Sequence, residues 1–296
     1  MGDEKTLLKR IRRIELKTKR LVDGLMQGAY YSIFKGRGIE FSEVREYHYG
    51  DDIRAIDWNV TARMNRPFVK EFVEERDLTV MIFFDVSGSI DFGTQDMLKR
   101  EAAVELIASI AFSAIRNNDR VGLILASSKI EKYITPRKGK KHAMRIIREI
   151  LYHRPEEKGT DLERPLIRLS KVMKKRGVIF IVSDFIEDLG KLEKPLRIMR
   201  KKHDVVAVRI VDVRESEIPD VGYVELEDGE TGEHFAVNTS DPDFRKNFSR
   251  IASERDASIA YFMKARKIDF IQIPASDNWQ KAAAKYFTEK TRRART

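Results

Sequence analysis

Three short stretches of the sequence carry small oxygen-bearing side chains that could bind a metal ion together. The first, DVSGS at 85–89, presents a carboxylate and two hydroxyls. GTDL at 159–162 and SDF at 183–185 add further hydroxyl and carboxyl groups. Hard divalent cations such as Mg²⁺ prefer oxygen ligands and need few carboxylates. We therefore predict a divalent-cation site whose ligands are Asp85, Ser87, Ser89, Thr160 and Asp184.

The segments around these stretches predict that they meet at one edge of a sheet. LTVMIFFD at 78–85 is apolar at nearly every position, which is typical of a strand buried on both faces. GVIFIVSD at 177–184 has the same character. Ligands of open α/β sheets bind beyond the carboxyl ends of the strands. Asp85 and Asp184 are therefore expected to lie at the binding edge.

Each stretch also has a structural interpretation, because Ser, Thr and Asp are frequent in turns and at helix starts. One such stretch alone would be weak evidence, but three in this arrangement favour a metal site. Asp161 is the residue for which the structural role is strongest. It is expected either behind the ligands, without touching the ion, or as an acid that opens a helix.

From residue 78 onward, predicted strands and helices alternate. Further strands are predicted at 120–126, 130–135, 204–212 and 267–273, and helices at 97–117, 140–151, 161–175, 190–202, 243–264 and 277–293. This alternation predicts an α/β fold with a mostly parallel central sheet flanked by helices. A β-hairpin over 222–238, turning in the region of Asp228–Gly229 and Thr231–Gly232, is predicted as an insert around 219–240.

Residues 1–76 are predicted to form an extension of the main domain at 77–296. The extension begins with an amphipathic helix over about 7–25 and continues with short strands and turns that lead into the main sheet. It contains GDDIRAIDWN, in which charges accompany a large aromatic side chain. This stretch is interpreted first as an ion-pair and packing cluster that anchors the extension. The alternative is a partner-docking surface, and its candidate residues are Arg54, Asp57 and Trp58.

Composition excludes several classes of protein. The 296 residues include no cysteine, which excludes disulfides, thiolate zinc sites and thiol catalysis. The sequence has neither an apolar run of about 18 residues nor a signal-peptide pattern, so we expect a cytoplasmic protein without a transmembrane segment. The net charge of +10 is concentrated at the two ends. Nucleic-acid binding, which usually needs a basic face on the folded surface, is not expected.

The motifs of common enzymes are also missing. Ser87 stands where a haloacid-dehalogenase phosphatase needs a second acid, and no phosphate-binding loop or G-x-S-x-G elbow occurs. The five histidines are scattered. We therefore expect a protein that is not an enzyme. Two alternatives stay open: a metal-dependent hydrolase that uses Asp85, and a basic scaffold for nucleic acid or anionic lipid.

DVSGS, GTDL and SDF, in this order, resemble the metal-ion-dependent adhesion site of von Willebrand factor A domains. The resemblance assigns the five predicted ligands to Mg²⁺, with Mn²⁺ or Ca²⁺ as alternatives, and implies an open coordination position for a partner's acidic side chain.

Longer segments resemble the bacterial family called domain of unknown function 58, namely GRGIEFSEVREYHYGDDIRAIDWNVTARMNRPFVKEF, KGKKHAMRIIREIL and IPDVGYVELEDGETGE. This resemblance implies a von Willebrand A-type, Rossmann-like fold. It also implies a soluble partner of a MoxR-type AAA+ ATPase in protein-complex assembly or activation.

Overall fold

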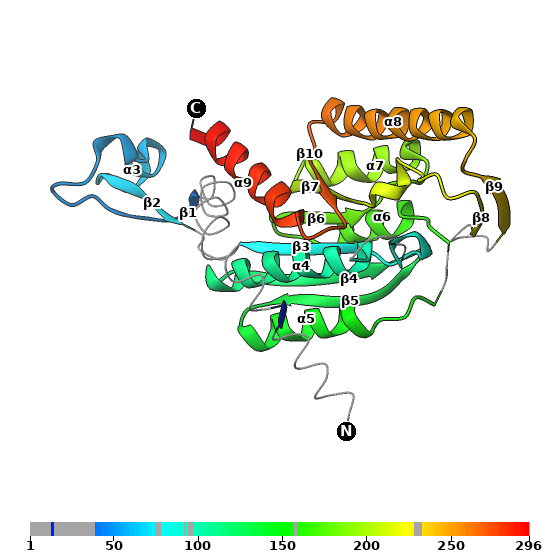
Figure 1. Ribbon diagram of the computed structural model, residues 1–296. Helices are drawn as coiled ribbons and strands as arrows, with labels where there is room; N and C mark the ends of the chain where they lie inside the picture. The colour runs from blue at the N-terminus through cyan, green and yellow to red at the C-terminus, as the bar shows by residue number, and fades with distance from the viewer. Residues whose placement is uncertain are drawn as a thin grey trace, which may run out of the picture.

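The centre of the molecule is a six-stranded sheet in the order β10–β7–β6–β3–β4–β5 (Figure 1). The computed structural model describes residues 13–14, 39–74, 78–91, 93, 97–156, 159–227 and 233–295. The strands of this sheet are β3 (Thr79–Asp85), β4 (Arg120–Ala126), β5 (Ile130–Arg137), β6 (Val178–Ser183), β7 (Asp204–Val211) and β10 (Asp269–Pro274). All neighbours are parallel except β5, which runs antiparallel to β4 at the edge.

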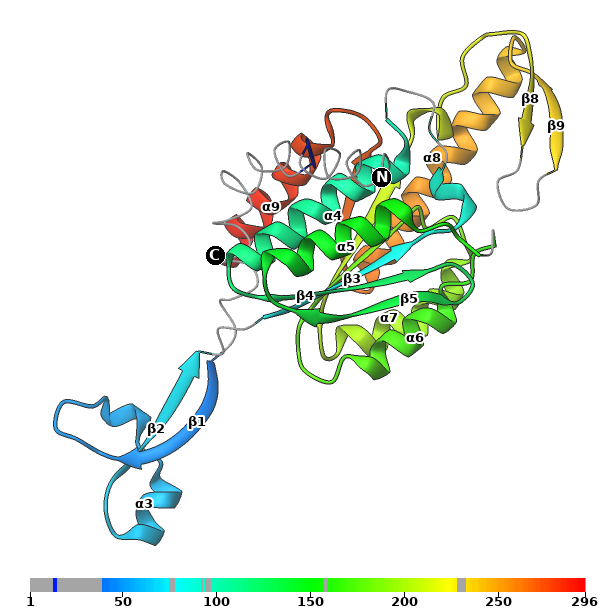
Figure 2. The ribbon, with the colours of Figure 1, turned by 90° about the horizontal axis from the view of Figure 1, so that it is seen from below.

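Helices cover both faces of the sheet (Figures 1 and 2). On one face lie α4 (Lys99–Arg116), α5 (Lys140–Tyr152) and α9 (Trp279–Arg295); on the other lie α6 (Glu163–Val172), α7 (Leu189–Arg200) and α8 (Pro242–Ala265). Along β3, Ile82 and Phe84 pack in the first core cluster, whereas Met81 and Phe83 pack in the second. A strand buried on both faces has to be apolar throughout, as the sequence of β3 is.

The predicted α/β fold with a mostly parallel, helix-flanked sheet is confirmed. The strand predicted at 267–273 joins the main sheet as β10, and the other strands and helices predicted from residue 78 onward differ from expectation only near their ends. β5 is the antiparallel exception because only residues 127–129 connect it to β4. A parallel pair would need a crossover of a dozen or more residues.

The extension forms a small sheet of its own. β1 (Ile39–Glu46) pairs antiparallel with β2 (Phe68–Glu74), and between them lie the 3-10 helix η3 (Ile53–Ala55) and α3 (Trp58–Met64). Figure 2 shows this unit projecting from the main domain, and its two strands, which precede β3 along the chain, form a sheet separate from the main one. The helix α3 was not predicted. It forms because Asp57 caps it, accepting hydrogen bonds from the backbone N–H groups of Asn59 and Val60.

The predicted N-terminal helix lies almost wholly outside the described residues. Residues 13 and 14 are described and are helical, and Ile14 packs in the core cluster beside α4.

The predicted insert is present as a separate hairpin. β8 (Tyr223–Glu227) pairs antiparallel with β9 (His234–Asn238), after the 3-10 helix η5 (Val213–Glu215) and before α8. Both ribbon views place it at the end of the molecule where the parallel strands have their carboxyl ends. The predicted turn at 228–232 lies outside the described residues. No helix in the described part of the chain is long and apolar enough to cross a membrane.

Candidate metal centre

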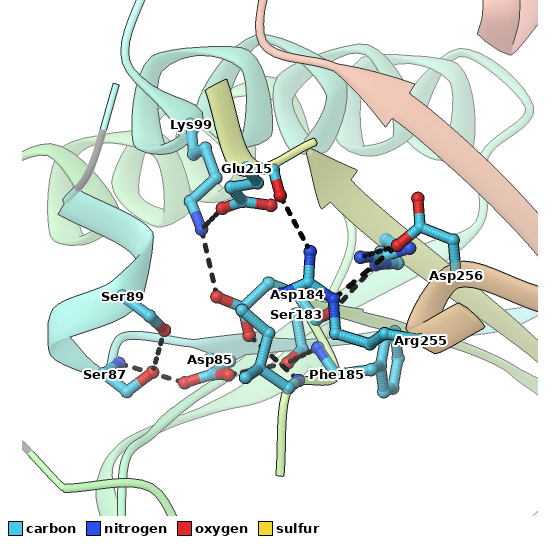
Figure 3. Close-up of polar contacts among 12 residues, drawn as sticks. Asp85, Ser87, Ser89, Lys99, Ser183, Asp184, Phe185, Glu215, Arg255 and Asp256 are labelled. Carbon is cyan, nitrogen blue, oxygen red and sulfur yellow. Dashed lines mark hydrogen bonds and ion pairs between the residues drawn. The ribbon is translucent and has the colours of Figure 1, made fainter. Parts of the chain in front are cut away.

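Asp85 ends β3 and is completely buried. Its Oδ1 accepts a hydrogen bond from the backbone N–H of Ser87 at 2.9 Å, and its Oδ2 accepts one from the hydroxyl of Ser183 at 2.7 Å (Figure 3). The turn that follows β3 brings the hydroxyls of Ser87 and Ser89 within 3.2 Å of each other. The three predicted ligands of the first stretch therefore lie together.

Asp184 directly follows β6, the neighbour of β3, and is also buried. Its charge acts on Asp85: burial first, and the negative charge of Asp184 second, raise the pKa of the Asp85 carboxyl to about 6. The hydrogen bonds from Ser183 and Ser87 oppose this shift without cancelling it. Two carboxylates from adjacent strands thus meet at the predicted edge of the sheet.

Glu187 is a third carboxyl near this edge, and sequence reasoning missed it. Burial raises its pKa to about 7, and the charges of Asp85 and Asp161 act in the same direction. Its Oε2 accepts a hydrogen bond from the backbone N–H of Leu162 at 3.3 Å, whereas its buried Oε1 has no hydrogen-bond partner in the described part of the chain. Its only signal in the sequence was its position three residues after Asp184.

The GTDL stretch connects to the same edge through Glu187. Thr160 is half-buried in the segment that precedes α6, two residues before the Leu162 amide that donates to Glu187. Asp161 accepts a hydrogen bond from the backbone N–H of Glu163 at 3.3 Å, which is the helix-start role expected of it. Its charge also reaches Glu187, so it contributes to the electrostatics of the site.

Two buried cations support Asp184, and neither was predicted. The ammonium of Lys99, the first residue of α4, lies 3.0 Å from Asp184 Oδ2 and 2.5 Å from Glu215 Oε1 of η5. Arg209 of β7 donates from Nε to the backbone carbonyl of Asp184 at 3.0 Å, and its Nη2 lies 2.8 Å from Asp256 Oδ1 of α8. These two side chains tie the Asp184 loop to four other elements, α4, η5, β7 and α8.

The donor set fits a hard divalent cation. The groups that hydrogen-bond Asp85 in the described structure are neutral, so the buried carboxylate has no cation of its own. In the described part of the chain, no three His, Cys, Asp or Glu side chains form a metal-binding group. Because Ser87 and Ser89 lie beside Asp85, cation binding here would use hydroxyl oxygens as well as carboxylates. The residues that would hold the ion are Asp85, Ser87, Ser89 and Asp184, with Thr160 in the adjoining segment.

The second predicted site, on the extension, is not an anchor. Trp58 keeps 68% of its surface exposed. The Arg54 side chain is 95% exposed and lies 3.6 Å from its near neighbour Asp52. Asp57 caps α3 and lies 3.5 Å from the ammonium of Lys70 on β2. The interpretation as a packing cluster against the main sheet is therefore wrong: Arg54 and Trp58 face solvent, and Asp57 organises the extension itself.

Known proteins are similar in sequence to this chain over nearly its whole length. An uncharacterized protein of Mycobacterium tuberculosis is 31% identical over 296 residues, which is 99% of this chain and 92% of that protein. Among solved structures, the conserved hypothetical protein BatB from Bacteroides thetaiotaomicron covers 73% of this chain and 99% of its own, with 15% identity and a TM-score of 0.47. A von Willebrand factor type A structure from Catenulispora acidiphila covers 77% of this chain and 44% of its own, with 12% identity and a TM-score of 0.41.

Both TM-scores lie below 0.5, so the description of the fold rests on the strand order and pairing of this chain alone. The family is shown by sequence. A family model described as "Protein of unknown function DUF58" matches residues 43–258, which is well over half of the chain. The chain therefore belongs to the DUF58 family.

Proposed function

We propose that this protein is a metal-dependent protein-interaction module. A divalent cation, Mg²⁺ before Mn²⁺ or Ca²⁺, would be held by Asp85, Ser87, Ser89, Thr160 and Asp184, and an acidic side chain of a partner protein would complete its coordination. The observation that carries this proposal is the buried Asp85 carboxylate, which lies beside Asp184 and two serine hydroxyls and, among the described residues, accepts hydrogen bonds from neutral groups.

The chemistry of the donor set supports binding of a partner carboxylate. Hydroxyl ligands are neutral, and Asp184 shares its charge with Lys99. A cation held by few full negative charges remains a strong electrophile. The chain's own groups orient the site: Ser183 fixes the Asp85 carboxylate, and the turn after β3 presents the two serines.

We further propose that the partner is a MoxR-type AAA+ ATPase or its client, and that the protein acts in the cytoplasm as an adaptor or co-chaperone without catalytic activity. This part rests on the family resemblance. The extension offers a second contact surface, since exposed apolar side chains gather on it. They are Tyr49, Ile53, Trp58 and Met64.

Metal-dependent hydrolysis is the second candidate function, and one observation favours it. Glu187 has a pKa raised to about 7, close to the value that suits a general acid or base near neutral pH. Turnover of a phosphate or peptide substrate that is lost in both Asp85→Ala and Glu187→Gln would identify a hydrolase.

The interaction proposal is tested by titrating Mg²⁺ into the chelator-treated protein in a calorimeter. The folded Asp85→Ala variant is titrated in parallel. A purified MoxR-type ATPase is then offered to immobilised protein with Mg²⁺, with chelator, and with the variant. Saturable Mg²⁺ binding and ATPase capture, both confined to the metal-loaded wild type, are expected. Equal capture in all three conditions would show that the metal site does not mediate the interaction.

A further inference from the structure

The side-chain ammonium of Lys99 is buried between the carboxylates of Asp184 and Glu215, which belong to different parts of the fold. Its side chain is 1% exposed, and those of Asp184 and Glu215 are 3% and 11% exposed. Figure 3 shows the Lys99 chain entering the site from α4 and ending between the two acids. The ammonium lies on the same Asp184 carboxylate that the proposed function assigns to a metal ion.

The two carboxylates hold this ammonium unequally. Lys99 Nζ lies 2.5 Å from Glu215 Oε1 and 3.0 Å from Asp184 Oδ2. The second oxygen of Glu215, Oε2, is buried and has no hydrogen-bond partner in the described part of the chain. An ammonium has three protons to donate, so Glu215 can accept more from Lys99 than it does here.

We propose that Lys99 is a displaceable counter-ion of Asp184. When a divalent cation binds beside Asp85 and Asp184, the Lys99 ammonium leaves Asp184 and keeps its contact with Glu215. The inference rests on the proposed metal site, and it adds two residues that determine the affinity of that site for the metal ion. Lys99 opposes metal binding, and Glu215 favours it by holding the displaced ammonium.

Electrostatics gives the direction of both effects. Two cations that share one buried carboxylate repel each other strongly, because the protein interior screens charge poorly. An ammonium that can move toward Glu215 reduces this repulsion. Glu215 is positioned to retain the ammonium because η5 is held against α8: the Glu215 backbone carbonyl accepts a hydrogen bond from Arg255 at 3.3 Å.

The test compares Mg²⁺ dissociation constants of the full chain, measured by calorimetry at one pH and one salt concentration. Lys99→Met removes the competing cation and is expected to bind Mg²⁺ on the order of tenfold more tightly. Glu215→Gln removes the charge that retains the displaced ammonium and is expected to bind about tenfold more weakly. Lys281→Met, which replaces an exposed lysine of α9, is the control and should match wild type.

A second readout does not depend on the folding of Lys99→Met. The nitrogen resonance of the Lys99 ammonium, assigned by comparison with Lys99→Arg, is followed by NMR while Mg²⁺ is added. In the wild type it is expected to shift with the same saturation curve as metal binding. In Glu215→Gln the shift should require a correspondingly higher Mg²⁺ concentration.

The two variants are expected to change the Mg²⁺ affinity in opposite directions, so the outcomes can be distinguished. If Lys99→Met and Glu215→Gln both weaken Mg²⁺ binding, Lys99 only supports the local structure and the inference is overturned. The same follows if wild type binds Mg²⁺ while the Lys99 resonance stays fixed. If the wild type itself shows no saturable Mg²⁺ binding, the proposed function fails and the inference fails with it.

Discussion

Ser183 donates its hydroxyl hydrogen to Asp85 Oδ2 at 2.7 Å, from the end of β6 to the end of the neighbouring β3. The same hydroxyl oxygen accepts a hydrogen bond from the backbone N–H of Phe185 at 3.0 Å. One small side chain therefore fixes the Asp85 carboxylate and the start of the Asp184 loop together. The relative position of the two acids depends on this hydroxyl.

Ser183→Ala is expected to destabilise the protein by about 1–3 kcal/mol, because it leaves a buried carboxylate oxygen without its donor. Urea unfolding at neutral pH with chelator measures the free energy of unfolding. Ser170→Ala is a matched control, since Ser170 donates only to the Ile167 carbonyl within α6 and is partly exposed. Equal stability of Ser183→Ala and wild type would show that the hydrogen bond does not hold the site.

Asp85→Asn is expected to stabilise the metal-free protein at pH 7.5. A rise of the Asp85 pKa from 3.8 to about 6 means that the ionised carboxylate costs roughly 3 kcal/mol in the folded state. The neutral amide avoids most of this cost, although it loses one of the two acceptor oxygens. Thermal unfolding in chelator should therefore give a higher Tm for the variant.

Added metal should largely offset this difference. Mg²⁺ at about 100 times its Kd would stabilise wild type by about 2.7 kcal/mol, and the variant should gain little of this. A Mg²⁺-induced rise in Tm that is the same in both proteins would exclude Asp85 as a ligand.

The sequence predicted the two acids because both follow strongly apolar strands. The adjacency of those strands is what places the acids together: β3 pairs in parallel with β6, with Phe84 opposite Val182. The sequence alone left that pairing open, since β4 and β5 lie between the two strands in the chain. The general rule that ligands of open α/β sheets bind beyond the carboxyl ends of the strands still placed both acids at one edge correctly.

The supporting cations could not be predicted in the same way. Arg209 did leave a signal, because it interrupts the apolar run DVVAVRIVD, but its partner Asp256 lies in a helix far along the chain. Lys99 left none, since a lysine at the start of a helix is usually solvated and only the packing of α4 turns it inward. The helix α3 spans only seven residues, too few for its hydrophobic periodicity to be read, and its cap Asp57 was the available clue.

His203 is expected to contribute a loss of stability as the pH falls below about 6.5. Burial lowers the pKa of this histidine from 6.5, and the charge of Lys202 acts in the same direction. A folded-state pKa below the unfolded value contributes stability above pH 6.5, and this contribution is lost as the pH falls toward the folded-state pKa. From pH 7.5 to 5.5, in chelator, the urea midpoint should change less favourably for wild type than for His203→Gln, because protonation of Asp85 and Glu187 acts in the opposite direction in both proteins. His234→Gln is the control because His234 is exposed, and a pH response that is identical in all three proteins would contradict the assignment.

Trp58→Ala is expected to leave stability within about 0.5 kcal/mol of wild type, because the side chain is 68% exposed and substitutions at such positions seldom cost more. Trp279→Ala is the matched comparison. Trp279 is fully buried and donates from Nε1 to Glu105 Oε2 at 2.8 Å, so its loss should cost about 3–5 kcal/mol. If Trp58 belongs to a partner surface, its variant should bind Mg²⁺ normally and capture the MoxR-type ATPase more weakly. A large loss of stability in Trp58→Ala would contradict its solvent-exposed position, and unchanged capture would remove the extension from the interface.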